Sequence, residues 1–230
     1  ARDGQEAVQR VEEVADGYYD LILMDIMMPV MNGITMCKIL KEDVRTSHIP
    51  IILLTAKDSL QDKEEGYQVG ADSYLTKPFS ATLLHSRINN LLESRKRLTE
   101  RFNTSTPHHN MDEKRALLAE SLNKLDNEFI EKINQLIEAR LSSEKIDIGY
   151  LADNMCMSKS TLYRKMKALT GLSTNEYVRK IKMQHAERLL LEGRYNISEV
   201  AFRVGINSVV YFRQCFKEEF GVLPSEYLKQ

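Results

Sequence analysis

The C-terminal part of the chain contains an internal repeat, and this repeat restricts the possible folds more than any other feature of the sequence. Residues 148–177 ("IGYLADNMCMSKSTLYRKMKALTGLSTNEY") align with residues 197–227 ("ISEVAFRVGINSVVYFRQCFKEEFGVLPSEY"), with one extra residue in the second copy. Each copy begins with a short helical stretch that carries a small residue, Ala152 or Ala201. Because alanine permits helices to cross closely, the repeat predicts two compact helix pairs.

The second helix of each copy has matching boundary residues. Ser158 and Ser208 stand before the helices, and Gly171 and Gly221 stand after them. Serine caps a helix N-terminus, and glycine adopts the left-handed conformation that ends a helix. This order of two helices with their boundary residues is that of a helix-turn-helix motif, and it occurs twice. A plain helical bundle with basic faces is the alternative interpretation, but it does not explain the repeated serine-to-glycine helices.

A helical stretch at 174–192 connects the two copies. At the usual rise its length is about 28 Å, and neighbouring major-groove faces on one side of a DNA duplex are about 34 Å apart. Charge is also unevenly distributed: residues 145–230 contain 14 Lys+Arg and 9 Asp+Glu, although the whole chain has a net charge of −1. This basic excess indicates where a polyanion would bind.

The N-terminal part has the alternating pattern of an α/β fold. Aliphatic runs at 20–25 and 49–56 predict strands that are covered on both faces. Helical patterns at 5–15, 33–44 and 59–69, a short strand at 72–78 and a helix from residue 80 complete the order. This order predicts a doubly wound parallel sheet.

Three strand ends carry polar side chains, Asp25, Thr55 and Lys77. In doubly wound sheets the functional crevice lies at these carboxyl ends. A carboxylate can accept a phosphoryl group, a hydroxyl can donate to a phosphate oxygen, and an ammonium can neutralise its charge. Taken singly, each residue has a structural interpretation as a cap, a turn hydroxyl or a surface charge. Their joint occurrence favours the functional one.

The segments "LILMDIMMPVMNG", "IILLTAKD" and "GADSYLTKPF" resemble the receiver domain of two-component response regulators. The resemblance covers about residues 1–95 and implies a flavodoxin-like fold. It implies Asp25 as the phosphoacceptor, Thr55 as the switch hydroxyl, Tyr74 as the switch aromatic and Lys77 as the phosphate-contacting cation. It also implies a cis peptide bond before Pro78.

A complete receiver opens with a strand that ends in an acidic pair. With the phosphoacceptor and the carbonyl two residues later, here that of Met27, this pair binds Mg²⁺. The sequence has no such strand before "ARDGQEAV", so we expect a receiver that lacks its first strand, holds Mg²⁺ poorly and accepts phosphate poorly. We interpret the chain as a piece of a longer protein such as a hybrid sensor kinase; a degenerate natural receiver is the alternative.

The segments "LADNMCMSKSTLYRKMKALTG" and "NISEVAFRVGINSVVYFRQCFKEEFGVLPSEY" resemble the AraC-type DNA-binding domain. The resemblance implies that the helices after Ser158 and Ser208 enter successive major grooves. The sequence departs from the family pattern at Cys156, where the family often has glycine, and at Gln214, where it often has arginine. The implied DNA-binding residues are Lys159, Ser160, Thr161, Tyr163, Arg164 and Lys167 in the first copy, and Ser208, Val210, Arg213, Gln214 and Lys217 in the second.

Within this set the resemblance assigns two kinds of contact. Bases would be faced by Ser160, Tyr163 and Arg164 and by Val210, Arg213 and Gln214. Phosphates would be met by Lys159, Lys167 and Lys217.

The domain organisation predicted from these patterns is a receiver at 1–97, a linker and connecting helix at 98–125, and a DNA-binding domain at 126–230. A long amphipathic helix is expected at 112–141, either continuous or interrupted near Asp126. The predicted function is a non-enzymatic, cytoplasmic transcription regulator controlled by aspartyl phosphorylation. Its expected partners are duplex DNA, a histidine kinase as phosphodonor and a second copy on DNA, with no membrane contact.

Two other functions are alternatives to this one. A DNA-binding regulator with a phosphorylation-independent receiver is the first. An aspartate-nucleophile phosphatase is the second, and it is disfavoured because such enzymes place a second acid where this chain has Met27.

Overall fold

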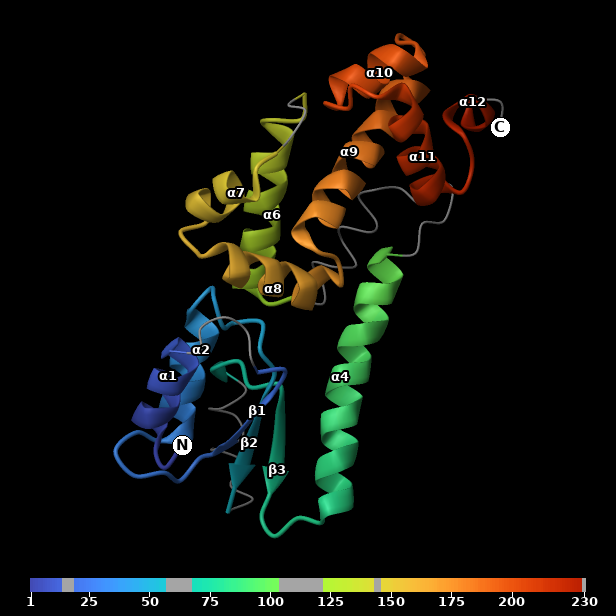
Figure 1. Cartoon of the computed structure of the whole chain (residues 1–230). Helices are drawn as coiled ribbons and strands as arrows, with labels where there is room; N and C mark the ends of the chain where they lie inside the picture. Colours follow the sequence, from blue (N-terminus) through green and yellow to red (C-terminus); the bar gives the residue numbers. More distant parts are fainter. Residues whose placement is uncertain (14–18, 57–67, 104–121, 143–145, 229–230) are drawn as a thin grey trace. The chain divides into compact units, whose positions relative to one another are not determined.

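The computed structural model describes residues 1–13, 19–56, 68–103, 122–142 and 146–228 (Figure 1). The chain divides into two compact units, Ala1–Leu98 and Thr99–Gln230. Within the described residues, no helix is long and apolar enough to cross a membrane.

The N-terminal unit is built on a parallel sheet. Its strands are β1 (Ile22–Asp25), β2 (Ile51–Thr55) and β3 (Ser73–Thr76), in the order β1-β2-β3. Asp25 pairs with Leu54, and Thr55 pairs with Thr76, so the three strand ends lie at one edge. The predicted doubly wound parallel sheet is confirmed.

Two helices, α1 (Gly4–Glu13) and α2 (Gly33–Glu42), pack beside each other on one face of this sheet (Figure 1). The core between them contains Val11 of α1, Met36 and Cys37 of α2, and Met24 and Leu53 of the sheet. Strand β2 is buried on both faces, as its lack of alternation indicated. The same prediction is wrong for β1, because Leu23 keeps 43% of its surface exposed.

Helix α4 (Ala81–Asn103) follows β3 and is longer than predicted. The linker is predicted to begin at residue 98, and residues 98–103 continue α4 instead of forming an irregular segment, although the division between the compact units falls at residue 98. The stretch "LTERFN" contains neither proline nor glycine, so nothing in it stops a helix. The helix predicted at 59–69 lies almost entirely outside the described residues.

The C-terminal unit is helical. Of the helix predicted at 112–141, the structure describes the part from residue 122, where α6 begins after Asn123, whose side chain accepts a hydrogen bond from the Asp126 amide. Residues 112–121 lie outside the described part. The helices are α6 (Lys124–Glu138), α7 (Ile148–Asn154), α8 (Lys159–Thr170), α9 (Thr174–Leu191), α10 (Ile197–Arg203), α11 (Val209–Phe220) and α12 (Pro224–Tyr227).

The repeat forms two helix-turn-helix pairs, α7–α8 and α10–α11. Ser158 and Ser208 accept hydrogen bonds from the amides of Thr161 and Tyr211, and so cap α8 and α11. Gly171 and Gly221 end these helices in the left-handed conformation, with φ of 73° and 78°. The boundaries predicted from serine and glycine are confirmed.

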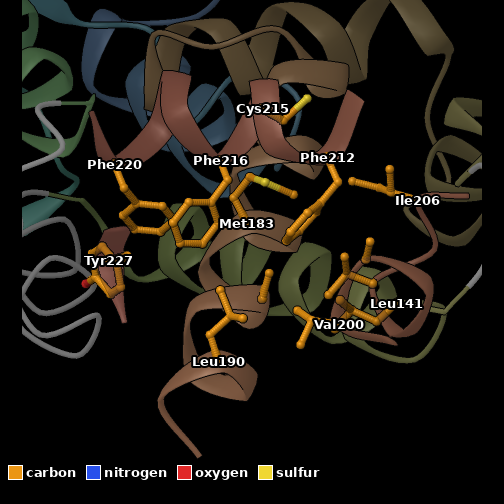
Figure 2. Close-up of a cluster of buried hydrophobic side chains, with 13 residues drawn as sticks. Leu141, Met183, Leu190, Val200, Ile206, Phe212, Cys215, Phe216, Phe220 and Tyr227 are labelled. Carbon is orange, nitrogen blue, oxygen red and sulfur yellow. The ribbon is translucent and has the colours of Figure 1, made fainter. Parts of the chain in front are cut away.

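Figure 2 shows the core that holds the second pair, with Met183 and Leu190 of α9, Val200 of α10 and Phe216 of α11 converging. The Phe216 ring lies 4.5 Å from the Phe220 ring centroid and meets the Tyr227 ring edge-on at 5.6 Å. Burying an aromatic side chain of this size stabilises a fold by about 2 kcal/mol. The core therefore fixes the buried side of α11 and determines which side chains remain outside.

Candidate functional site

An ion pair joins the first and third strand ends of the sheet. The Lys77 ammonium lies 2.5 Å from Oδ2 of Asp25, and both side chains are about one-third exposed. The Lys77 amide donates to the Thr55 carbonyl at 2.6 Å, which extends the β2–β3 register past the end of β3. The predicted carboxylate and ammonium therefore meet. The peptide bond between Lys77 and Pro78 is cis, as the resemblance implied.

The N-terminus of α2 approaches the Asp25 strand end very closely. The Gly33 amide donates to the Ile26 carbonyl at 2.9 Å. A Cβ added to Gly33 would lie 2.2 Å from the Asp25 carbonyl oxygen, so no larger residue fits without backbone movement. The other carboxylate oxygen of Asp25 accepts from the Met27 amide at 3.2 Å. Asn32 caps the N-terminus of α2. Gly33, which has no side chain, permits this N-terminus to approach the end of β1.

Thr55 and Tyr74, the predicted switch residues, are both buried. Thr55 ends β2 with 3% of its surface exposed, and Tyr74 lies in β3 as part of the core between sheet and helices. The structure thus places the hydroxyl at the same sheet edge as Asp25 and the aromatic ring inside the domain. Their roles as switch residues stay predictions.

The described residues at Asp25 do not fit a magnesium site. Both carboxylate oxygens of Asp25 already accept hydrogen bonds, from Lys77 and Met27. In the part of the chain that the structure describes, no cluster of three or more His, Cys, Asp or Glu could hold a metal ion. Magnesium is held by carboxylates with several waters, and the single Asp25 carboxylate supplies too little negative charge for such a site.

Helix α8 turns one polar face outward. Ser160, Tyr163, Arg164 and Lys167 are exposed, and their spacing of three, four and seven residues places them on one side of the helix. Tyr163 keeps 46% of its surface accessible. The opposite side, which includes Leu162 and Met166, is buried.

Helix α11 repeats this arrangement. Val210, Arg213, Gln214 and Lys217 are exposed at the same spacing, while Phe212, Cys215 and Phe216 face the core. Val210 is 77% exposed. The Gln214 amide donates to Glu218 of the same helix at 3.1 Å. Lys159 and Ser208, the remaining predicted contacts, are exposed at the N-terminal ends of α8 and α11.

Thr161 is the one predicted DNA-facing residue that lies inside the unit. Only 6% of its surface is exposed, and its hydroxyl lies 2.8 Å from that of Ser158. It shares the buried side of α8 with Leu162 and Lys165, because residues four apart lie on one helix face. We therefore remove Thr161 from the set of DNA-facing residues.

The two turns have the same backbone shape with different residues. Cys156 in the first turn has φ of 54°, and Gly205 in the second has φ of 67°. The residues correspond in the alignment of the repeat. The departure at Cys156 therefore leaves the turn geometry intact and places an exposed thiol beside α8.

Three buried lysines were missed by the sequence reasoning. Lys165 pairs with Asp126, Lys180 pairs with Glu219 at 3.1 Å, and the Lys182 ammonium donates to the Gly205 carbonyl at 3.3 Å. Each joins two elements of the C-terminal unit. The signal that could have found Lys165 is its place among Leu162, Met166 and Leu169 on the apolar side of α8.

Family models match both units. Residues 1–89 match the response regulator receiver domain, and residues 151–230 match a helix-turn-helix domain of the AraC type. The chain therefore combines a response regulator receiver domain with a helix-turn-helix domain.

Three relatives illustrate what this chain is similar to. Histidine kinase P4 of Formosa agariphila is 36% identical over 207 residues, which are 90% of this chain and 15% of that protein. The uncharacterized transcriptional regulatory protein YclJ of Bacillus subtilis is 49% identical over 86 residues, 37% of this chain and 35% of that protein. The C-terminal domain of AraT, a response regulator from Geobacillus stearothermophilus, is 31% identical, with 44% of this chain and 84% of that chain covered and a TM-score of 0.41.

This chain therefore spans well under two thirds of the length of either curated relative. Its domain composition, a receiver and an AraC-type helix-turn-helix domain, is that of a DNA-binding transcription regulator in two-component signalling.

Proposed function

We propose that this chain binds a specific duplex DNA sequence through α8 and α11, and that phosphorylation of Asp25 controls this binding. The observation that carries the proposal is the pair of exposed faces. Two helices with the same caps each turn outward four side chains at positions i, i+3, i+4 and i+7. Their inward faces pack inside the unit and their outward faces are exposed, which is the arrangement in which a helix can enter a groove.

The exposed side chains suit both kinds of DNA contact. Arg164 and Arg213 can donate two hydrogen bonds to guanine, and Gln214 can pair with adenine. Lys167 and Lys217 stand one turn further along each helix, where an ammonium can reach phosphate oxygens and orient the protein without reading sequence. The second half-site would then differ in sequence from the first, because α8 carries Arg164 at the position that Gln214 occupies in α11.

The DNA part is tested by selection from a pool of duplexes of random sequence with the full chain at low salt. We expect one bipartite sequence to be enriched. Arg164→Ala and Arg213→Ala should each relax discrimination in a different half-site, by about tenfold or more. Arg194→Ala is the matched control, since Arg194 is exposed between α9 and α10, outside both faces. A pool that stays random after selection at low salt contradicts the proposal.

The chemistry of control is phosphoryl transfer to a carboxylate. Asp25 attacks the phosphorus of a phosphohistidine or acyl phosphate donor, the donor's bond to phosphorus breaks, and an aspartyl phosphate forms. Lys77 is already in contact with Asp25 and would neutralise the added charge. Thr55 at the neighbouring strand end would donate to a phosphoryl oxygen. A shift of the receiver surface would follow and alter pairing of two copies on DNA.

Intact-mass measurement after incubation with acetyl phosphate and Mg²⁺ tests this part. It is run on this chain and on a version preceded by the acidic strand of a complete receiver. We expect one added phosphoryl group in the extended version and none in its Asp25→Asn variant. No phosphoryl uptake by the extended version would favour a phosphorylation-independent regulator. Rapid release of free phosphate without accumulation would favour a phosphatase.

A further inference from the structure

A fully buried ion pair connects α6 to the recognition helix α8. The Lys165 ammonium lies 2.5 Å from Oδ1 of Asp126, and the two side chains are 0% and 3% exposed. The same ammonium lies 4.9 Å from the centroid of the Phe129 ring. Burial of two charges is costly unless their geometry is well fixed, so the pair constrains how α8 can sit on α6.

Asp126 is also tied to the first residue before α6. Its second carboxylate oxygen accepts a hydrogen bond from the Asn123 side-chain amide at 2.9 Å. The Asn123 side-chain oxygen in turn accepts from the Asp126 backbone amide at 2.9 Å. Asn123, Asp126 and Lys165 therefore form one chain of hydrogen bonds from the N-terminal cap of α6 into the middle of α8. We call these three residues the cap relay.

Helix α9 precedes the second helix-turn-helix pair as α6 precedes the first, and it supplies a comparison. Ser173 caps α9 as Asn123 caps α6, and Glu176 stands three residues after its cap as Asp126 does. The carboxylate of Glu176, however, is exposed and accepts a hydrogen bond from the Ser173 amide at 2.7 Å, within the same capping box. The residue of α11 that corresponds to Lys165 is Cys215. The cap relay therefore occurs beside the first helix-turn-helix pair and has no equivalent at these positions beside the second. The helix-turn-helix shape does not require it.

Lys165 lies between the outward-facing residues of α8. Arg164 precedes it and Lys167 follows it by two positions, so a rotation of α8 about its own axis would move both away from a groove. Apolar contacts are not directional and permit small rotations, whereas a charge-assisted hydrogen bond has a fixed geometry. The pair therefore holds the rotational setting of α8 more tightly than the surrounding apolar contacts can.

We infer that Asp126 and Lys165, supported by Asn123, are positioning residues that set the orientation of α8 for reading the first DNA half-site. This inference rests on the proposed DNA-binding function. It assigns the three residues no contact with DNA. Their effect is expected on base discrimination in the half-site read by α8 and not in the half-site read by α11.

The main test uses a double variant, Asp126→Leu with Lys165→Met, which removes both charges and keeps apolar volume. Such replacements commonly preserve or increase stability, so the melting temperature should not fall. The probe is the duplex enriched by the unaltered full chain, with each base pair substituted in turn. We expect discrimination in the α8 half-site to fall about tenfold and discrimination in the α11 half-site to stay unchanged. A folded double variant with unchanged discrimination in both half-sites overturns the inference.

A milder variant keeps the inference testable if the double variant does not fold. Asn123→Ala removes one hydrogen bond of the cap relay at an exposed position, and Ser173→Ala removes the corresponding cap of α9. Both lose one helix cap, so both should melt at slightly lower temperature. Only Asn123→Ala should weaken discrimination in the α8 half-site. Equal discrimination by the two variants overturns the inference.

A DNA-independent readout separates this inference from the proposed function. Spin labels are attached at Arg164→Cys and Gln214→Cys in a background where exposed Cys156 is replaced by glycine. The distance distribution between α8 and α11 should broaden in the double variant and in Asn123→Ala, but not in Ser173→Ala. If no DNA sequence is enriched by the unaltered chain, the proposed function fails, and the inference is judged by the distance distribution alone. A broadened distribution supports a positioning role for the cap relay, and an unchanged distribution overturns this role.

Discussion

At the scale of single residues, the two turns of the repeat differ in how they reach a left-handed backbone. Cys156 holds φ of 54° although its Cβ disfavours that region, whereas Gly205 holds φ of 67° without this conflict. A left-handed residue with a side chain costs about 1–2 kcal/mol, and glycine costs about 0.5–1 kcal/mol in lost chain entropy. We therefore expect Cys156→Gly to raise the free energy of unfolding by about 0.5 kcal/mol, measured by chemical denaturation.

The second turn provides the reverse substitution. Gly205→Ala places a Cβ at a buried position of the same shape, so the free energy of unfolding should fall by about 1 kcal/mol. If Cys156→Gly destabilises the protein as well, backbone strain is not the difference between the turns.

The three cysteines should react with a thiol reagent at very different rates. Cys156 is exposed, and Cys37 and Cys215 are buried. Burial raises the pKa of the Cys37 thiol to about 11, so almost none of it is the reactive thiolate near neutral pH. We expect one thiol per chain to react rapidly with a chromogenic disulfide, and the Cys156→Ser variant to show no rapid phase. Rapid reaction of two thiols would show that one buried site opens easily.

At the scale of elements, the contact between α2 and the end of β1 has no space for a side chain. The Cβ of a Gly33→Ala variant would lie 2.2 Å from the Asp25 carbonyl oxygen. Relief requires backbone movement, and the expected loss in the free energy of unfolding of the N-terminal unit is about 2 kcal/mol. Thermal denaturation measures this loss. Gly193→Asn is the control, because nothing lies within 4 Å of that Cβ and asparagine tolerates the left-handed region.

The capping box at the start of α9 should make stability depend on acid. The Ser173 hydroxyl and amide hydrogen-bond to Glu176 and lower the pKa of its carboxyl below its ordinary value. Because the folded-state pKa is the lower one, the stabilisation is present above the unfolded-state pKa and is lost as pH falls through the folded-state pKa. We expect the unaltered chain to lose more stability between about pH 5 and pH 3 than Glu176→Gln does. Parallel losses in the two proteins would contradict this.

Helix ends that depend on neighbouring residues were predictable from the sequence, whereas contacts between residues far apart in the chain were less predictable. Ser158 and Gly221 fix helix ends through hydrogen bonds within a few residues, and their positions were predicted correctly. Asp25 and Lys77, 52 residues apart, were also placed together because parallel strands end at one edge. Lys165 was missed because its partner Asp126 is 39 residues away on α6, and neither residue signals the pairing by itself.

The misplacement of Thr161 has the same physical origin. The helix after Ser158 was predicted correctly, but which of its polar residues face outward depends on where α6 and α9 pack against it. Thr161 lies on the side of α8 that also carries Lys165. In a sequence, lysine and threonine are expected to be surface residues. Thr161 and Lys165 therefore interrupt the apolar periodicity by which the buried side of α8 could have been recognised.

At the scale of the whole molecule, the division into two units predicts separate folding. The aromatic and aliphatic core of Figure 2 lies entirely between Leu141 and Tyr227. Residues 112–230 expressed alone should therefore give a cooperative thermal transition and the helical circular dichroism of α6–α12. A midpoint within a few degrees of one transition of the full chain is expected. A non-cooperative transition would mean that this core depends on residues 1–111.

The salt dependence of DNA binding tests how the whole surface divides phosphate contacts from base contacts. Each phosphate contact releases condensed counterions, so the slope of log K against log salt changes by about 0.9 per contact. Lys217 is exposed one turn after Arg213 and is expected to meet a phosphate, whereas Gln214 is expected to face a base. Lys217→Ala should therefore reduce the magnitude of the slope by about 0.9 and weaken binding evenly across sequences. Gln214→Ala should leave the slope unchanged and relax discrimination at one base pair. Lys132→Ala is the control, because it removes an exposed charge of α6 that lies outside both faces. If Lys132→Ala changes the slope as much as Lys217→Ala does, DNA binding depends on the net charge of the unit and not on contacts made by α11.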